Sequence, residues 1–204
     1  MVWDVLNVIG TIAFAMSGAL VALQVKYDII GAYVLGLITA FGGGAIRNLF
    51  TGIPIIQLWQ QTTLFIVALI TITIVILLPN KAVKLLTKWS FFDSIGLSAF
   101  AVQGAMYAQS MNLPLFAVMF SAAITGAGGG MVRDVLAQQR PIVLRQEIYL
   151  LWAIFAGFLI GMDLLSAAHH YYIIFTIILI MRGISHRFNW SLPTRPVQNP
   201  KEDV

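Results

Sequence analysis

The amino-acid sequence predicts an all-α membrane protein with seven transmembrane helices, arranged as two inverted three-helix repeats plus a seventh helix. Three observations lead to this fold class. Only 10% of the 204 residues are charged, against about 25% in soluble domains, and 59% are hydrophobic. Long apolar segments alternate with short polar ones, and the first half of the chain matches the second half at a fixed offset. The charged residues are too few to cover a soluble surface, so lipid must be the main solvent.

Seven segments have the length and apolarity that a transmembrane helix needs, which is roughly 20 residues for about 30 Å of hydrocarbon. They are residues 5–24, 29–50, 62–79, 91–110, 115–137, 147–165 and 168–184. Because the connections between them are short, we expect residues 1–185 to form a single transmembrane domain. Residues 186–204 are polar and contain three prolines, so we expect a tail with little fixed structure.

Threading the chain through seven spans places most basic residues on one side of the membrane. That side receives Lys26, Lys81, Lys84, Lys88, Arg140, Arg145, Arg182 and Arg187. The other side receives the N-terminus, the loop of residues 51–61, a turn at Asn112 and the pair His169–His170, with no lysine. Since cytoplasmic loops carry the excess of basic residues, the N-terminus is predicted outside and the C-terminal tail in the cytoplasm.

The first three spans match the second three at an offset of 86 positions. This offset places Trp3 on Trp89, Phe14 on Phe100, Gly42–Gly44 on Gly128–Gly130, Arg47 on Arg133 and Asn48 on Asp134. Repeat 1 covers about residues 3–79 and repeat 2 about 89–165, and the seventh helix at 168–184 lies outside the symmetry. Each repeat holds an odd number of spans, so the second copy is predicted to enter the membrane from the opposite face.

Three consecutive glycines interrupt the second span at 42–44 and the fifth span at 128–130. Each glycine lowers helix propensity by roughly 1 kcal/mol relative to alanine, so we predict that helices 2 and 5 break there. Broken backbone at membrane depth has to be buried in protein or line a watery cavity, and matched breaks in two halves indicate a permeation site. The alternative is that these glycines only let two helices pack closely.

Arg47 and Arg133 follow the glycines inside their spans. A charge in the bilayer interior costs at least ~2.5–3.5 kcal/mol, so each guanidinium should face a cavity or a partner. Asp134 is one candidate partner for Arg133, and Asp93 and Asn7, matched near the starts of the two repeats, are alternatives. The competing interpretation is that both arginines extend to a membrane interface, which suits Arg133 near the cytoplasmic side.

The residues predicted to line the pore or to take part in gating combine the glycines with polar side chains of the same region. They are Gly42, Gly43, Gly44, Arg47, Asn48, Gly128, Gly129, Gly130, Arg133, Asp134, Thr39, Thr125, Ser17 and Gln103. For any single hydroxyl in this set, a hydrogen bond back to its own helix is the competing interpretation. Glycines elsewhere, such as Gly10, Gly18, Gly96 and Gly104, are expected to serve helix packing.

The sequence carries no signature of an enzyme. Cysteine is absent, which excludes disulfides and thiol chemistry. His169 and His170 are adjacent and do not share a helix face, and no zinc-protease, nucleophile-elbow or phosphate-loop motif occurs. We therefore expect no catalytic residue, no cofactor and no tightly bound metal. The net charge of +4 indicates a membrane surface rather than nucleic acid as the partner.

Seven spans, a three-plus-three repeat and glycine-rich second and fifth helices resemble the trimeric intracellular cation (TRIC) channels. The most specific stretches are Gly42 to Arg47 and Gly126 to Asp134, and the resemblance covers about residues 3–185. It implies a prokaryotic member in the inner (plasma) membrane, similar to bacterial sequences that carry the label "glycine transporter domain". It also implies a homotrimer with one pore in each protomer, lined mainly by helices 2 and 5, that passes K⁺ and also Na⁺.

The loop between the third and fourth spans departs from the animal members of that family. Those resemble one another in a Lys-Glu-Val stretch that is associated with phosphoinositide lipids, whereas this loop holds Lys81, Lys84 and Lys88 and no acidic residue. The three lysines predict a plain attraction to anionic lipid headgroups.

The residues by themselves leave the transported species open. Helix N-termini at a break favour anions, as the arginines do, whereas carbonyls at helix C-termini favour cations. Cation selectivity is implied by the resemblance alone. The alternatives are a secondary transporter of a small solute such as glycine, and a scaffold protein without a permeation path.

Overall fold

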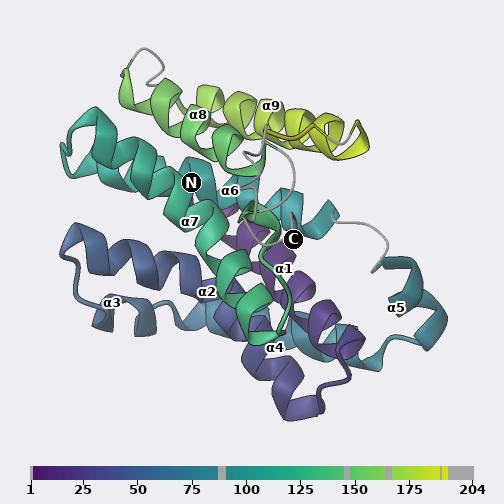
Figure 1. Cartoon of the computed structure of the whole chain (residues 1–204). Coiled ribbons are helices and arrows are strands. Elements are labelled where there is room, and N and C mark those ends of the chain that lie inside the picture. Colours follow the sequence, from purple (N-terminus) through teal and green to yellow (C-terminus); the bar gives the residue numbers. More distant parts are fainter. Residues whose placement is uncertain (1, 87–90, 145–147, 164–166, 189, 193–204) are drawn as a thin grey trace, which may run out of the picture.

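The structure, a computed structural model, describes residues 2–86, 91–144, 148–163, 167–188 and 190–192, and all regular elements within these ranges are helical (Figure 1). They are α1 (Val2–Gln24), α2 (Ile29–Thr51), α3 (Ile56–Trp59), α4 (Thr62–Leu77), α5 (Asn80–Leu86), α6 (Phe91–Ser110), α7 (Leu115–Leu136), the 3-10 helix η1 (Ile142–Leu144), α8 (Tyr149–Gly161) and α9 (Ala168–Arg187).

Each of the seven predicted spans coincides with a helix, namely α1, α2, α4, α6, α7, α8 and α9. The largest difference is at α8, which covers 13 residues of the predicted 147–165. Within the described ranges, α1, α2, α7 and α9 are long and apolar enough to cross a membrane. A fifth span results if α4 and α5, which meet at a bend of 117°, are counted as one. The chain is therefore an integral membrane protein.

Three short elements lie outside the predicted spans, and each follows a proline. The helix α3 begins two residues after Pro54, and α5 and η1 begin directly after Pro79 and Pro141. Proline has no N–H and a fixed φ near −65°, which suits the first turn of a helix, where the N–H groups have no intrahelical partner. Each proline therefore lies where a new helical turn can start, and at Pro79 the chain also changes direction by 117°.

The helices divide into two packed groups with α1 and α6 between them (Figure 1). One large buried cluster joins α1, α2 and α4 with Phe100 of α6, and another joins α6, α7, α8 and α9 with Val2 and Leu6 of α1. The groups meet where Phe14 of α1 and Phe100 of α6 pack edge to face, with ring centroids 5.3 Å apart. A Cβ added at Gly10 would collide with Phe100, and one added at Gly96 would collide with Phe14. These two glycines therefore serve packing, as expected.

The helices α2 and α7 cross at their triple-glycine segments, and the contact is reciprocal. A Cβ added at Gly43 would overlap the carbonyl oxygen of Thr125, and one at Gly129 would overlap the carbonyl oxygen of Thr39. The partner residue number falls in α7 as it rises in α2, so the two helices run in opposite directions through the crossing. Their C-terminal halves, which carry Arg47 and Arg133, consequently lie on opposite sides of it.

The prediction that helices 2 and 5 break at the glycines is wrong. Both α2 and α7 are continuous α-helices through residues 42–44 and 128–130. An unpaired backbone group in hydrocarbon costs several kcal/mol, more than the roughly 1 kcal/mol propensity loss of one glycine, so the helical hydrogen bonds are kept. The glycines instead allow two helix backbones to approach, which is the alternative that the sequence left open.

Candidate functional site

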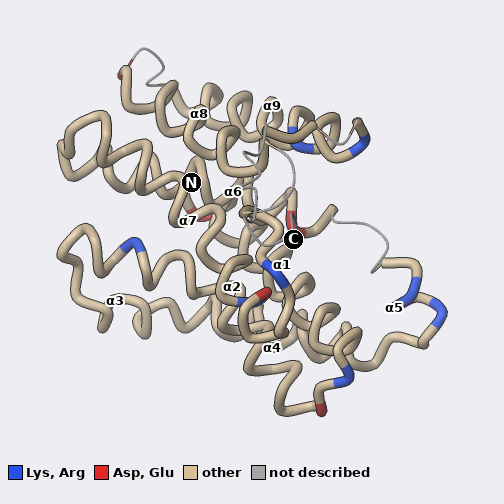
Figure 2. Tube along the Cα trace, in the orientation of Figure 1, with Lys and Arg blue, Asp and Glu red and all other residues tan. Residues whose placement is uncertain are grey.

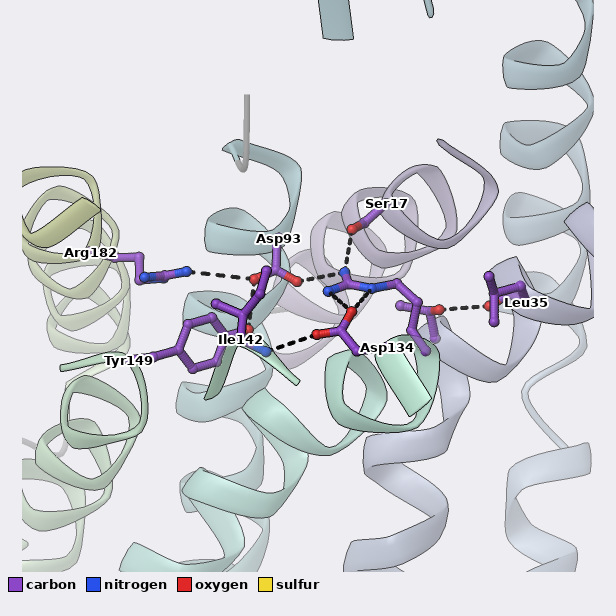
Figure 3. A network of polar contacts seen from close by, with 9 residues as sticks. Ser17, Leu35, Asp93, Asp134, Ile142, Tyr149 and Arg182 are labelled. Atoms are coloured by element: carbon purple, nitrogen blue, oxygen red, sulfur yellow. Dashed lines mark hydrogen bonds and ion pairs between the residues drawn. The ribbon is translucent and has the colours of Figure 1, made fainter. Parts of the chain in front are cut away.

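Arg133, in the C-terminal half of α7, is buried among hydrogen-bond acceptors (Figure 3). Its side chain is 3% exposed. Nη1 donates to Asp93 Oδ1 at 2.7 Å and to Ser17 Oγ at 2.5 Å. Nε and Nη2 donate to Asp134 Oδ1 at 2.8 and 2.7 Å. Arg133 therefore has partners on α1, α6 and α7. Both predicted carboxylate partners are confirmed, and the interface interpretation is wrong for this residue.

Asp93, at the start of α6, links Arg133 to a second buried arginine (Figure 3). Its Oδ2 accepts a hydrogen bond from the hydroxyl of Tyr149 at 2.7 Å and lies 3.8 Å from Nη2 of Arg182. The Arg182 side chain is 0% exposed, and its guanidinium carbon lies 4.0 Å from the ring centroid of Tyr149. We call Ser17, Asp93, Arg133, Asp134, Tyr149 and Arg182 the Arg133 cluster. Its two arginines and two aspartates balance in charge.

Arg47, the residue of α2 that corresponds to Arg133, has a different environment. It is 6% exposed. Its Nε and Nη2 donate to the amide oxygen of Asn48 at 3.2 and 2.9 Å, and its guanidinium carbon lies 4.2 Å from the ring centroid of Tyr107. Within the described ranges, Arg47 forms no ion pair. Arg47 is therefore a buried charge that is held by an amide and an aromatic ring.

The offset of 86 positions relates the two arginine sites residue by residue. Arg133, Asp134, Asp93 and Ser17 correspond to Arg47, Asn48, Asn7 and Gln103. Both carboxylates of the first site thus have an amide at the matching position. The Arg47 site therefore has the arginine but has amides at the two positions where the Arg133 cluster has carboxylates.

A cavity of about 500 Å³ lies beside Arg47, between the first repeat and α6. We call it the Arg47 cavity. Its polar lining includes Asn7, Thr11, Arg47, Asn48 and Gln103, and it extends along Gly44 to Thr125 near the helix crossing. No carboxylate is among its lining residues, and Asp93, Arg133 and Asp134 do not reach it. The cavity therefore ends at the glycine crossing, with the Arg133 cluster on the other side.

The remaining predicted pore residues fall into two groups. The hydroxyls of Thr39 and Thr125 donate to carbonyl oxygens four residues earlier in their own helices, those of Leu35 and Ser121. Both threonines therefore form the hydrogen bond to their own helix that the competing interpretation describes. Gly44 and Gln103 line the cavity, and Thr125 lines it as well. Part of the predicted pore set thus lies in the Arg47 cavity on one side of the helix crossing and part in the Arg133 cluster on the other.

Sequence reasoning missed the roles of Tyr149, Tyr107 and Arg182. Arg182 carried a usable signal, since it is a charge near the end of an apolar span, although it was assigned to the cytoplasmic flank. Nothing in the sequence distinguishes Tyr149 or Tyr107 from tyrosines that face lipid headgroups. Their positions depend on how α6, α8 and α9 pack, which local pattern does not encode.

The predicted headgroup lysines lie on or beside α5, which has no buried residue (Figure 2). Lys81 is exposed, Lys84 is in the last turn of α5, and Lys88 lies outside the described residues. Charged residues are sparse along the longer helices, as Figure 2 shows. Within the part of the chain that the structure describes, no group of three His, Cys, Asp or Glu side chains could hold a metal ion.

Comparison with known proteins gives relatives along nearly the whole chain. A family model described as "Glycine transporter" matches residues 4–80 and 90–163. The UPF0126 membrane protein YvgT of Bacillus subtilis is 50% identical over 196 residues, which cover 96% of this chain and 97% of the relative. The UPF0126 inner membrane protein YadS of Escherichia coli K12 is 38% identical over 155 residues, or 74% of each chain.

Two solved structures of TRIC channels are similar in both sequence and fold. A chain from work on conductance through TRIC cation channels is 34% identical with a TM-score of 0.77, and the match covers 98% of this chain and all of that one. A prokaryotic TRIC channel, with a crystal structure in 0.5 M KCl, is 33% identical with a TM-score of 0.82, covering 94% of this chain and 99% of that one.

Proposed function

The chain belongs to the TRIC-like membrane-protein family whose model is described as "Glycine transporter", and on this premise we propose that it is a monovalent cation channel. The proposed permeant ions are K⁺ and Na⁺, and the proposed pore runs through each protomer along α2 and α7. The observation that carries the proposal is the 33–34% identity, over almost the full length, to structures of TRIC cation channels.

The arrangement of the described helices supports a path of this kind. The Arg47 cavity enters from one end and stops at the crossing of Gly43 and Gly129, and the Arg133 cluster lies beyond the crossing. We propose that the crossing is the closed constriction, and that a small separation of α2 from α7 joins the two sides. Because the glycines have no side chains, such a movement exposes backbone carbonyls, which favour cations.

We further propose the finer architecture that the resemblance implies. The reciprocal contacts of Gly10 with Phe100, Gly96 with Phe14, and the two glycine segments with each other support two inverted repeats. In this arrangement all seven long helices span the membrane, three protomers form a homotrimer, and the N-terminus lies outside the inner membrane. Lys81 and Lys84 then face the cytoplasmic headgroups.

Single-channel recording of the purified protein in planar lipid bilayers tests the proposal. We expect unitary currents carried by K⁺ and by Na⁺. A Cβ at Gly44 has no neighbour closer than 3.9 Å, so the side chain of Gly44→Leu extends into the cavity and should lower the unitary conductance. The matched control is Gly183→Leu on α9, where an added Cβ meets nothing within 4 Å and the position is exposed. Equal conductance in both variants would place the pore elsewhere.

The second candidate function is secondary transport of a small solute such as glycine. One observation favours it, namely a cavity with several polar lining side chains that extends to the helix crossing, as expected for one access state of an alternating-access cycle. Silent bilayers together with saturable, concentrative glycine uptake into liposomes would support this function and reject the channel.

A further inference from the structure

We propose that the Arg47 cavity is a binding site for a small anion, either a halide ion or the carboxylate group of a small solute, held on the guanidinium of Arg47. This site is a property of the cavity itself and does not depend on whether the protein conducts ions. The proposal stands on three observations: a buried arginine that has no ion pair among the described residues, space beside it, and polar side chains that line that space.

No carboxylate of the described ranges balances the charge of Arg47. Two of its nitrogens donate to Asn48, and Nη1 makes no hydrogen bond or ion pair within the described residues. The side chain is 6% exposed, so bulk solvent does not surround it. A charged group in such a position is stable when it is paired or hydrogen-bonded. The missing partner has to be negative or strongly polar.

The Arg133 cluster shows which groups neutralise an arginine at the matching position of the second repeat. At Arg133, carboxylate oxygens of Asp93 and Asp134 lie 2.7 Å from the guanidinium nitrogens. The corresponding positions at Arg47 are Asn7 and Asn48, which carry amides and no charge. A bound anion would supply from solution the negative charge that the protein itself supplies in the Arg133 cluster.

The cavity also has room and additional donors for such a ligand. Its volume is about 500 Å³, much larger than one ion or one carboxylate group needs. Asn7 and Gln103 line it with amide groups, which donate hydrogen bonds to anions. Thr11 lines it as well, is 1% exposed, and has a hydroxyl without a hydrogen-bond partner. Amides and hydroxyls can either donate or accept, so the guanidinium of Arg47, which is positively charged and only donates, is the group that favours an anion over a cation.

Titration of the purified protein with sodium bromide tests the site, with sodium isethionate, which is neither a halide nor a carboxylate, as the replaced salt so that ionic strength stays constant. We expect bromide to raise the midpoint of thermal unfolding in a saturable manner, because a ligand of the folded state stabilises it. Bromide also scatters anomalously, so an anomalous peak within about 3.5 Å of the Arg47 guanidinium is expected in crystals soaked in it. A parallel titration with sodium acetate distinguishes a carboxylate site from a halide site.

Three variants make the test specific. Arg47→Gln should weaken bromide binding at least about tenfold, since a hydrogen bond to a charged group is lost. Asn48→Asp places a carboxylate beside Arg47, as in the Arg133 cluster, and should abolish the bromide response in a protein that still folds. Arg140→Gln, at an exposed position outside the cavity, should behave as the wild type.

The proposal is overturned if neither bromide nor acetate shifts the unfolding midpoint, if Arg47→Gln or Asn48→Asp responds as the wild type does, or if the anomalous peak lies away from Arg47. A bromide response with no ionic current would leave the anion site standing and reject the channel. Ionic current with no response to either anion would support the channel and reject the anion site.

Discussion

Arg47 and Arg133 are buried at positions that correspond under the 86-residue offset, yet among the described residues only Arg133 is paired with carboxylates. Arg133 lies against two carboxylates, a serine hydroxyl and, through Asp93, a tyrosine and a second arginine. Arg47 lies against one amide and one aromatic ring. The difference teaches that two arginines at corresponding positions can be buried with different compensation, by carboxylates in one case and by an amide and an aromatic ring in the other.

Because the two arginines have different partners, we expect the two sides of the helix crossing to have different roles. A balanced network of charges that is hydrogen-bonded across several helices fixes their relative positions, because each member is costly to leave unpaired. A guanidinium beside a cavity, with donors that are not all used by the protein, can bind a ligand or ion that enters the cavity. We therefore expect the Arg133 cluster to act mainly on stability and the Arg47 site mainly on ligand and ion interactions.

The largest predicted effect separates the arginines directly. Arg133→Gln leaves Asp134 buried without its cation and should lower the free energy of unfolding by about 3–5 kcal/mol. Arg47→Gln removes contacts with Asn48 and Tyr107 only and should cost about 1 kcal/mol. Denaturant titrations of both variants in the same detergent measure the difference. Equal losses would mean that the two sites do not differ in compensation as the contacts indicate.

A second prediction compares the tyrosines that face the arginines. Tyr149→Phe removes a hydroxyl that donates to the buried carboxylate of Asp93 at 2.7 Å, so we expect a loss of about 1.5–3 kcal/mol. Tyr107→Phe keeps the ring below Arg47 and removes only an exposed 3.3 Å hydrogen bond to Gln57. Its free energy of unfolding should stay within about 0.5 kcal/mol of the wild type. Thermal unfolding of the two variants, measured in the same detergent, tests whether Tyr149→Phe is the more destabilising of the two.

The third prediction concerns the crossing that separates the two sites. Gly129→Ala brings a Cβ into the carbonyl oxygen of Thr39, and we expect a loss of about 1–3 kcal/mol from overpacking. Gly42→Ala is the matched control in α2, because its Cβ meets no atom closer than 3.8 Å. That control should be neutral or gain about 0.5–1 kcal/mol from helix propensity. If both alanines destabilise alike, close approach is not the reason for the glycines.

The long helices were predictable because the hydrocarbon core of the bilayer requires long apolar segments. Apolar runs located every long helix, and the 86-residue offset paired Arg47 with Arg133 before any contact was known. The break at the glycines was predicted wrongly because propensity measured in water was applied at membrane depth. There an unpaired backbone group costs several kcal/mol, so three glycines of roughly 1 kcal/mol each stay helical once a second helix packs against them.

The candidate sites were predictable only in part. The sequence offered Asp134 as one candidate partner of Arg133, with Asp93 and Asn7 as alternatives, because a buried charge requires a partner, and the structure pairs Arg133 with both carboxylates. It did not reveal that Arg182 reaches Asp93 from α9, since this contact depends on the packing of a helix outside the repeat. It also did not reveal the Arg47 cavity, because the space left between side chains is set by tertiary packing and not by local pattern.

The smallest predicted effect converts one arginine site toward the other. Asn48→Asp gives Arg47 the carboxylate that Arg133 already has, and we expect the free energy of unfolding to rise by about 1 kcal/mol, as for a well-placed ion pair of limited exposure. The gain must disappear when the same substitution is made in Arg47→Gln, so a double-mutant cycle isolates the pair. Under the proposed channel function, the added negative charge beside the cavity also raises K⁺ conductance, which bilayer recording measures. A gain in stability that persists without Arg47 would show that the introduced carboxylate acts on some other group, and the comparison between the two arginines would lose its explanation.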